Sequence, residues 1–389
     1  MRILICGAGI AGPTLAFWLS RFGHEPVLVE RAPAPRQGGY VIDFWGTGFE
    51  VAQRMGLVPS LLERGYRVQE LREVDAKGRR ITGIDPRPLI ERSQGRYVSI
   101  ARADLAALLL ESIESRVPTR YGDSIAALDD DGARVHVRFD SGATEEFDLV
   151  IGADGLHSRV RELAFGPEAQ FSRDLGIAVA AIELEGYRPR DETLAVTHTV
   201  VGAQALRFTG PDDRTIFFFS FRHEGPVPLD DRAAAEQLLR QRLSGMGWEV
   251  PAALEAMSSS QNLYLDKAAQ IRMPSWSAGR IGLLGDAAAS PSLLAGQGAA
   301  LAMVEAYLLA VRLRELGDHV AAFASLYAQL EPVVRAKQNA ALQLGSVFAP
   351  RNRRELWIRN QGMKVVSIPW MAKLFIGRSL YDPIELPEA

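Results

Sequence analysis

The chain has 389 residues, which is enough to bury a large core and to form two domains. Its 44 basic and 47 acidic residues nearly cancel, and this argues against a nucleic-acid-binding protein that relies on broad attraction to phosphate. The single cysteine, Cys6, excludes an internal disulfide and a cysteine-based metal cluster, so no metal site is expected. The N-terminal apolar run is interrupted by glycine, and no stretch of the sequence approaches the roughly 18 uncharged apolar residues that a membrane-spanning helix needs. We therefore expect a cytoplasmic protein without membrane contact.

The first thirty-one residues carry the most informative pattern in the chain. An apolar run at 3–6 precedes the sequence Gly-Ala-Gly-Ile-Ala-Gly at 7–12, and further apolar runs follow at 15–19 and 27–29. This order predicts a strand, a tight turn, a helix and a second strand. The arrangement is typical of dinucleotide binding, and a Gly-rich turn in an ordinary βαβ unit is the alternative.

Each glycine of this turn has its own physical task. Gly7 permits the turn, Gly9 lets the backbone approach a pyrophosphate, and Gly12 lets helix and strand pack closely. Amide groups at the helix N-terminus then face the phosphates, with help from the helix dipole. Glu30 ends the second strand, where a carboxylate can accept hydrogen bonds from a ribose diol.

Residues 32–48 are rich in proline and glycine and are predicted to form a crossover loop without a further strand. The Gly38-Gly39 pair lets backbone approach a flat ligand, and Arg36 and Asp43 flank that pair. The alternative is a solvated surface loop.

Further elements of this half follow from hydrophobic periodicity and turn signals. They are helices at about 48–55 and 102–113 with mixed short strands between them, a hairpin at 133–147 and a buried strand at 147–152 that leads to Asp154-Gly155. Arg102 begins the second helix and is either a ligand for a phosphate or ring edge or a surface charge.

The hydrophobic pattern then changes from alternating strands and helices to consecutive strands, and this change indicates a second domain. Four β-rich runs at 178–185, 193–201, 204–209 and 214–222 predict an antiparallel sheet, and a helix follows at 232–243. The run from 216 to 221 is so aromatic that we expect both faces of this sheet to be covered.

The nucleotide pattern then returns with a strand at 280–286, a loop at 287–298 and a helix at 299–316. Helices are also predicted at 318–347, which Pro332 should kink or break, and at 352–375. The latter carries Trp357 and Trp370 and is predicted to brace the two domains, with a membrane-surface helix as the alternative. The predicted domains are a discontinuous cofactor domain (1–170 and 271–330), a sheet domain (171–270) and C-terminal bridging helices (331–389).

Three motifs follow one another along the chain. They are Gly7-x-Gly9-x-x-Gly12 with Glu30, then Asp-Gly-Leu-His-Ser-Arg-Val-Arg at 154–161, then Gly285-Asp286 followed by Gly-Gln-Gly at 296–298. Over nearly the whole chain this resembles the single-component (group A) FAD-dependent monooxygenases, the para-hydroxybenzoate hydroxylase-like family. Within it the chain is most similar to the tetracycline-inactivating flavin monooxygenases. The resemblance implies an α/β fold: a Rossmann-type FAD-binding domain interrupted by an antiparallel-sheet α+β substrate domain, with C-terminal helices.

The resemblance also implies roles for individual residues toward FAD and NAD(P)H. FAD is expected to contact Gly7, Gly9, Ala11, Gly12, Glu30, Arg31, Gly39, Asp43, Arg102, Asp154, Gly155, Asp286 and Gly298. In the family Glu30 holds the adenosine ribose, Arg31 lies near the adenine, and the Asp154-Gly155 motif serves both FAD and NAD(P)H. Asp286 contacts the ribityl or ribose, and the helix after Gly298 points its N-terminus at the isoalloxazine. Arg36 approximates an arginine associated with NADPH.

The motif around Gly285-Asp286 departs from the family at several places. Ala289 stands where the family has histidine, Leu293 where it has proline, and Ala300 where it has asparagine. FAD binding tolerates these changes, but substrate identity and the efficiency of hydroxylation do not transfer.

A substrate pocket is predicted between the inserted sheet and the flavin. Its expected residues are Phe208, Phe217, Phe219, Phe221, Leu293 and Leu294. Such walls favour a large, flat, mostly apolar molecule over a small carboxylated phenol, for which Arg207 is the only buried-arginine candidate on the sheet. The alternative is that the phenylalanines are core between the sheet and the helix at 232–243.

The family's chemistry needs little from protein side chains, since NAD(P)H reduces the flavin and O₂ forms a C4a-hydroperoxyflavin that oxygenates the substrate. No catalytic side chain is therefore expected. The predicted function is FAD-dependent, NAD(P)H-consuming hydroxylation of an aromatic, polyketide or tetracycline-like molecule by a monomer or homodimer. The alternatives are an FAD-containing protein that sequesters a flat compound, and a flavin reductase or halogenase.

Overall fold

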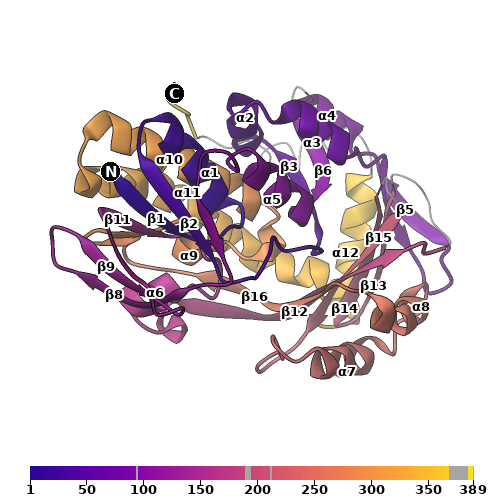
Figure 1. Ribbon diagram of the computed structural model, residues 1–389. Coiled ribbons are helices and arrows are strands. Elements are labelled where there is room, and N and C mark those ends of the chain that lie inside the picture. Colours follow the sequence, from indigo (N-terminus) through magenta and orange to yellow (C-terminus); the bar gives the residue numbers. More distant parts are fainter. Residues whose placement is uncertain (93–94, 189–193, 211–212, 368–383, 389) are drawn as a thin grey trace.

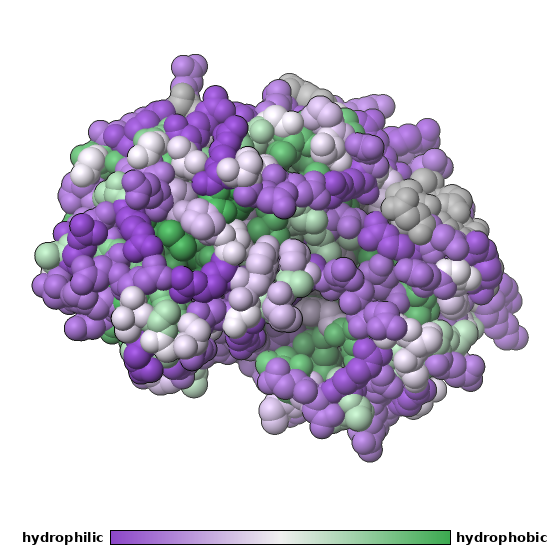
Figure 2. All heavy atoms as spheres, in the orientation of Figure 1, coloured by the Kyte–Doolittle hydropathy of each residue, from purple (hydrophilic) through white to green (hydrophobic). Residues whose placement is uncertain are grey.

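The computed structural model describes residues 1–92, 95–188, 194–210, 213–367 and 384–388 (Figure 1). Two large sheets dominate it, one in each half of the molecule, with helices on their faces. On the face that Figure 2 shows, hydrophilic residues predominate and apolar residues are seen mainly in hollows. No helix of the described residues is both long enough and apolar enough to cross a membrane.

The first sheet has six strands in the order β17-β18-β11-β1-β2-β7. Its strands are β1 (Arg2–Cys6), β2 (Glu25–Glu30), β7 (Thr119–Tyr121), β11 (Leu149–Gly152), β17 (Ser277–Ala278) and β18 (Ile281–Leu283). All neighbours pair in parallel except β17 and β18. Residues 3–5 of β1 are fully buried, as expected for a parallel strand covered on both faces.

Helices and small sheets complete this half of the molecule. The helices are α1 (Ala11–Arg21), α2 (Thr47–Arg54), α3 (Val58–Arg64), α4 (Arg87–Arg92), α5 (Arg102–Glu111), α6 (Arg159–Phe165), α9 (Asp286–Ala289), α10 (Gly298–Leu316) and the short 3₁₀ turns η1 (Glu168–Gln170) and η3 (Leu293–Ala295). The small sheets are β3 (Val41–Trp45) with β6 (Tyr97–Ala101), and β8 (Ile125–Asp130), β9 (Val135–Phe139) and β10 (Thr144–Phe147). In the six-stranded sheet, β18 joins strands from the first 152 residues.

The second sheet has seven strands in the order β16-β12-β15-β14-β13-β4-β5. They are β4 (Glu70–Val74), β5 (Arg80–Ile84), β12 (Ser172–Glu185), β13 (Leu194–Val200), β14 (Ala203–Thr209), β15 (Arg214–Arg222) and β16 (Leu263–Ile271). One face is covered by α7 (Arg232–Leu243), α8 (Val250–Ala256) and the 3₁₀ turn η2 (Met257–Ser259), and the other face turns toward the cofactor half (Figure 1).

Two expectations about these elements are corrected. The predicted cofactor domain includes residues 70–84, but β4 pairs in parallel with β13 and so belongs to the second sheet. The loop predicted at 32–48 contains a strand, β3, which pairs with β6. Both strands gain their hydrogen bonds from partners that are distant in sequence, which local composition does not reveal.

The C-terminal helices are α11 (His319–Phe348) and α12 (Arg353–Val366). Helix α11 continues through Pro332, so of the two predicted effects, a kink or a break, the break is wrong and the kink stays a prediction. Pro332 is exposed, and water can therefore satisfy the carbonyl that loses its intrahelical donor. The helix predicted at 352–375 is confirmed up to 366, whereas residues 368–375, with Trp370, lie outside the described residues.

Alternation along β15 gives its two faces different partners. Phe217, Phe219 and Phe221 pack against α7 and α8, and Phe218 points to the other face with Ile216. All the residues from 215 to 221 are buried, so the expectation that both faces of the sheet are covered is confirmed.

Helix α12 is tied to the second sheet by a buried ion pair. The Arg359 guanidinium donates to the Glu73 carboxylate at 2.9 Å, and both side chains are at most 5% exposed. The Thr197 hydroxyl donates to the same carboxylate at 2.6 Å. The helix thus attaches to two neighbouring strands, β4 and β13.

Replacing Arg359 by alanine leaves the Glu73 carboxylate buried without its cation. We expect a loss of about 3–5 kcal/mol in the free energy of unfolding, because an uncompensated buried charge is left behind. Urea unfolding measures this, and Arg353→Ala, which removes an exposed arginine from the same helix, is the matched control. Equal stability of the two variants would contradict the structural role of the pair.

Candidate cofactor site

A cavity lies at the carboxyl end of β1, where residues from both halves of the molecule meet. Its walls come from the β1–α1 turn, β3, the start of α5, the loop after β11, β16, and the segment from β18 to the start of α10. The three sequence motifs therefore converge on one place. Among the predicted site residues, those that line the cavity are Gly9, Ala11, Asp43, Arg102, Gly155, Asp286, Leu293 and Gly298.

The glycine-rich turn is built by close backbone contacts. A Cβ on Gly7, whose φ is +106°, would lie 2.4 Å from the carbonyl oxygen of Ala153, and a Cβ on Gly12 would lie 1.9 Å from the carbonyl oxygen of Gly7. A Cβ on Gly9, in contrast, would meet only the Arg102 guanidinium, at 3.9 Å. Gly7 and Gly12 thus allow close backbone packing, whereas the space next to the Gly9 Cα is open and belongs to the cavity.

Glu30 is buried at the end of β2 beside this turn. Its carboxylate accepts the amide of Ala8 at 2.9 Å and the amide of Ala32 at 2.9 Å, which fixes the side chain next to the β1–α1 turn. Arg36 lies 3.7 Å from the Glu30 carboxylate and its side chain is 66% exposed. Arg31 is exposed. The structure therefore gathers these three residues at one end of the site.

The Asp154 side chain makes hydrogen bonds within the protein. One carboxylate oxygen accepts the Ser158 hydroxyl at 2.5 Å, and the other accepts the amides of Arg159 and Val160 at 2.7 and 3.1 Å. These contacts cap the N-terminus of α6 and use both oxygens. Gly155, with a φ of +82°, lines the cavity itself.

Asp286 and Arg102 supply half-buried charge to the cavity wall. Burial raises the pKa of the Asp286 carboxyl, and the nearby Arg102 guanidinium opposes this by favouring the charged form. A Cβ on Gly298 would lie 3.7 Å from the Asp286 carboxylate. The first turn of α10 thus begins beside Asp286, and its free amides face the cavity with the positive end of the helix dipole.

Asp43 lies on β3 and is held in a hydrogen-bonded cluster. It accepts the hydroxyls of Tyr97 and Ser99, each at 2.6 Å. The loop before β3 approaches β16 closely, because a Cβ on Gly38 would lie 2.4 Å from Asn262. Gly39, with a φ of +113°, meets no atom in this way.

Several wall residues are not identified by the sequence patterns. They are Tyr40, Tyr264, Asp266 and Lys267. The ring centroid of Tyr40 lies 5.6 Å from that of Tyr264 and 6.0 Å from that of Phe218. Tyr40 directly follows the Gly38-Gly39 pair, which is the available signal. The other three lie on β16, a strand that the sequence does not predict.

The loop after α9 carries a strained residue. Ser292 has a φ of +84°, which is uncommon for a residue other than glycine, and precedes Leu293 and Leu294. Leu293 lines the cavity, and Leu294 packs with Phe208 and Phe218 on the inner face of the second sheet.

Three predicted substrate residues are corrected. Phe217, Phe219 and Phe221 pack in the core between the second sheet and helices α7 and α8, on the face away from the cavity. Alternation shows that they share a face but cannot show which face. Phe218 of the same strand and Phe208 of β14 turn toward the cofactor half.

Glu305, on α10, is a site residue that the sequence analysis misses, although it is the only acidic residue in the first two-thirds of that apolar helix. Its carboxylate accepts the amide of Gly285 at 2.5 Å, so it fixes the turn before Asp286. Burial raises the pKa of Glu305 to about 8, and the hydrogen bond from Gly285 opposes the shift.

These features fit FAD. The open space over Gly9 suits a pyrophosphate, the Glu30 carboxylate suits a ribose diol, and the N-terminus of α10 suits the negative charge of a reduced flavin ring. Ala300, where the family has asparagine, packs against Gly48 of α2, since a Cβ on Gly48 would lie 2.6 Å from its side chain. This departure therefore serves helix packing.

The fold and site define a flavoprotein, and comparison with known proteins agrees. The family model described as "FAD binding domain" matches residues 1–322. A flavin-dependent monooxygenase from an unknown prokaryotic organism is 38% identical over 352 residues, covering 89% of this chain and 90% of the relative.

Solved structures of two tetracycline destructases are also similar. Tet(51) is 30% identical, with a TM-score of 0.84 over 100% of this chain and 99% of its own. Tet(55) is 33% identical, with a TM-score of 0.83 over 100% of this chain and 98% of its own. The chain belongs to the FAD-dependent monooxygenases of group A, in the branch that resembles the tetracycline-inactivating enzymes.

Replacing Gly9 by valine should prevent FAD binding without unfolding the protein. Its backbone lies outside the left-handed region, and the new side chain would enter the cavity and occupy pyrophosphate space. The variant should be colourless by flavin absorbance but keep its circular dichroism spectrum. The exposed Gly245→Ala is the control, and a folded Gly9→Val protein with full flavin content would refute the placement.

Replacing Glu305 by glutamine should flatten the dependence of stability on pH. The folded-state pKa of about 8 exceeds that of an unfolded glutamate, so the stability of the native protein falls as pH rises from about 4.5 to 8. Glutamine keeps an acceptor for the Gly285 amide but does not ionise. Melting temperatures across this range measure the effect, and identical pH profiles of the two proteins would contradict it.

Proposed function

We propose that this enzyme uses NADPH and O₂ to hydroxylate a large, flat, mostly apolar molecule of the polycyclic aromatic, polyketide or tetracycline type. The substrate lies between the cofactor cavity and the inner face of the seven-stranded sheet. The observation that carries the proposal is the character of that face, which is aromatic and aliphatic beside the cavity.

The residues of this face support a large apolar ligand. Phe208, Ile216 and Phe218 lie together on the inner side, and Tyr40 contacts Phe218 from the cofactor half. Aromatic walls of this kind suit stacked or edge-to-face contact with a fused ring system. Phe208, Leu293 and Leu294 remain the proposed substrate contacts from the sequence, to which we add Phe218.

Neither Arg207 nor Arg214 of the sheet favours a small carboxylated phenol. Arg207 lies on the outer face, where its guanidinium donates to Glu249 at 2.6 Å and lies over the Trp248 ring. Arg214 lies toward the inner side but donates to Asp104 at 2.8 Å. Each of these cations already has a carboxylate partner.

The protein's own contribution is binding, orientation and exclusion of water. When bound, FAD supplies the redox chemistry that transfers reducing equivalents to O₂ and oxygen to the substrate. Gly9 and the N-terminus of α1 would hold the pyrophosphate, and Arg102, Asp286 and the α10 dipole would set the charge around the ring system. Tyr40 and Tyr264 shield the reacting region from water.

NADPH is the proposed reductant, and Arg36 is the proposed partner of its additional phosphate. The exposed guanidinium is held only loosely, at 3.7 Å from Glu30, and is thus available to an incoming anion. This assignment is independent of the substrate class. The similarity to Tet(51) and Tet(55) supports a tetracycline-like substrate.

Substrate-stimulated NADPH oxidation tests the proposal. Tetracyclines and anthraquinone-like polyketides should stimulate the purified holoenzyme more than simple hydroxybenzoates do, since only large ligands fill the apolar wall. Under ¹⁸O₂ the product should contain the heavy isotope. Stimulation by the small acids alone would overturn the substrate class, and label entering only from water would overturn monooxygenation.

Two phenylalanines on opposite faces of β15 provide a matched pair of variants. Phe218→Leu removes an aromatic contact on the inner face and should raise KM several-fold, in line with roughly 0.5–1.5 kcal/mol for an aromatic pair. Phe221→Leu makes the same change on the outer face and should leave KM unaltered. Equal effects on KM would contradict the proposed position of the substrate.

A further inference from the structure

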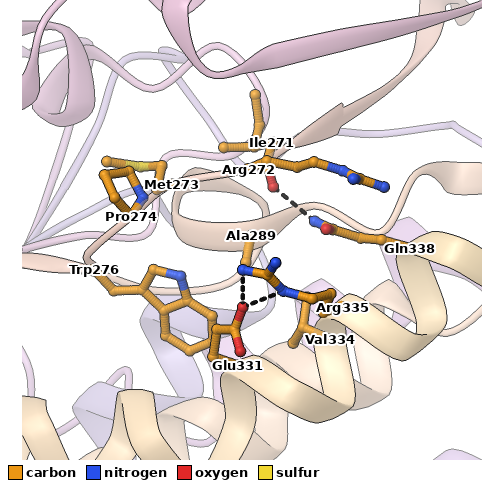
Figure 3. Close-up of a pocket in the computed structure, with 10 residues that line it drawn as sticks. All are labelled: Ile271, Arg272, Met273, Pro274, Trp276, Ala289, Glu331, Val334, Arg335 and Gln338. Carbon is orange, nitrogen blue, oxygen red and sulfur yellow. Dashed lines mark hydrogen bonds and ion pairs between the residues drawn. The ribbon is translucent and has the colours of Figure 1, made fainter.

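A second cavity of about 300 Å³ lies behind α9, between the chain that follows β16 and helix α11 (Figure 3). Asp286 and Ser290 line the cofactor cavity, whereas Ala289 lines this one. The four-residue helix α9 therefore separates the two spaces. Ala289 contributes only a methyl group to this wall.

The second cavity has an excess of positive charge. Arg272 and Arg335 line it, and Arg173 lies next to them, because its partner across the sheet is Gln270, two residues before Arg272. Burial and repulsion from Arg173 and Arg335 lower the pKa of Arg272. Glu331 is the one acidic residue among the lining residues.

These arginines are incompletely neutralised. Glu331 pairs with Arg335, one turn away on α11 (Figure 3). Arg272 donates to the side-chain oxygens of Gln270, at 2.9 Å, and Asn339, at 3.4 Å, which are neutral acceptors. No carboxylate of the described residues pairs with Arg272 or Arg173. The site therefore holds more cationic than anionic groups.

The remaining walls are apolar. Trp276, Met273, Pro274 and Val334 line the cavity beside Ala289. Trp276 is held in place by an edge contact with Tyr327, with ring centroids 5.4 Å apart. An indole fixed beside guanidinium groups is suited to a flat ring that carries a negative charge.

The framework of the cavity is fixed by buried amides. The Gln338 side chain donates to the carbonyl oxygens of Ile271, at 2.7 Å, and Ser290, at 3.1 Å, and it is 4% exposed. The fully buried Gln270 donates to the carbonyl oxygen of Gln338 at 2.7 Å. The wall is thus preorganised for a ligand.

We propose that this cavity is a second ligand site, which binds a small aromatic anion. The ring lies against Trp276 and Val334, and the carboxylate or phosphate pairs with Arg272 and Arg335. The volume fits a one- or two-ring molecule and is too small for a dinucleotide. The site is distinct from the cofactor cavity and does not depend on the proposed substrate.

Calorimetry on the FAD-loaded enzyme tests the site, with 2-naphthoate and adenosine 5′-monophosphate as the two probes. At least one should bind at sub-millimolar concentration, and the affinity should weaken between about 50 and 300 mM NaCl because the contact is ionic. The two probes distinguish a carboxylate from a nucleotide phosphate as the recognised anion. The neutral analogue 2-naphthylmethanol should bind much more weakly.

Variants place the binding in this cavity. Arg272→Gln should weaken the bound probe about tenfold or more, because a charge-assisted contact is lost. Arg240→Gln, which removes an exposed arginine from distant α7, should have no effect. If neither probe binds at millimolar concentration, or if Arg272→Gln and Arg335→Gln bind as the unaltered enzyme does, the proposal is wrong.

Discussion

The cofactor site depends on how closely three pieces of backbone can approach one another at the carboxyl end of β1. Gly12 packs against the carbonyl of Gly7, and Gly7 packs against the carbonyl of Ala153, at separations that admit no side chain. This contact sets the start of α1 against the loop after β11. Once the two segments are fixed, Gly155 and the Gly285-Asp286 turn lie around one cavity, and Glu30 is held beside the β1–α1 turn by the amide of Ala8. The shape of the site thus depends on glycine at two positions where a side chain would not fit.

The sequence predicts this half of the molecule well because its signals are local. The glycine spacing, the apolar runs and the acid at residue 30 all lie within one βαβ unit, and the later motif returns as a strand that joins the same sheet. Strands β3 and β16 escape prediction, and the pairing of β4 with β13 does too, because these features are defined by contacts with distant segments. Their composition alone does not differ enough from that of loops.

The candidate site is predicted less completely for related reasons. Both oxygens of the Asp154 carboxylate cap α6, a use that the sequence does not reveal because a carboxylate beside a helix start can also serve a cofactor. Its role toward the cofactors stays a prediction. Glu305 is one polar residue in an apolar helix, and only the folded chain brings it to the Gly285 amide. Arg207 is the buried cation that the sequence suggests, but its partner Glu249 is on a segment that no sequence pattern connects with it.

The side chains of strand β15 alternate between two faces of the sheet, and each face has its own contacts. Odd-numbered Phe217, Phe219 and Phe221 hold α7 and α8, whereas even-numbered Ile216 and Phe218 face the cofactor half. Because the side chains alternate strictly, either set can change while the other stays constant. A combinatorial library that varies only the even positions therefore changes the inner face of the sheet and leaves the core against α7 and α8 as it is.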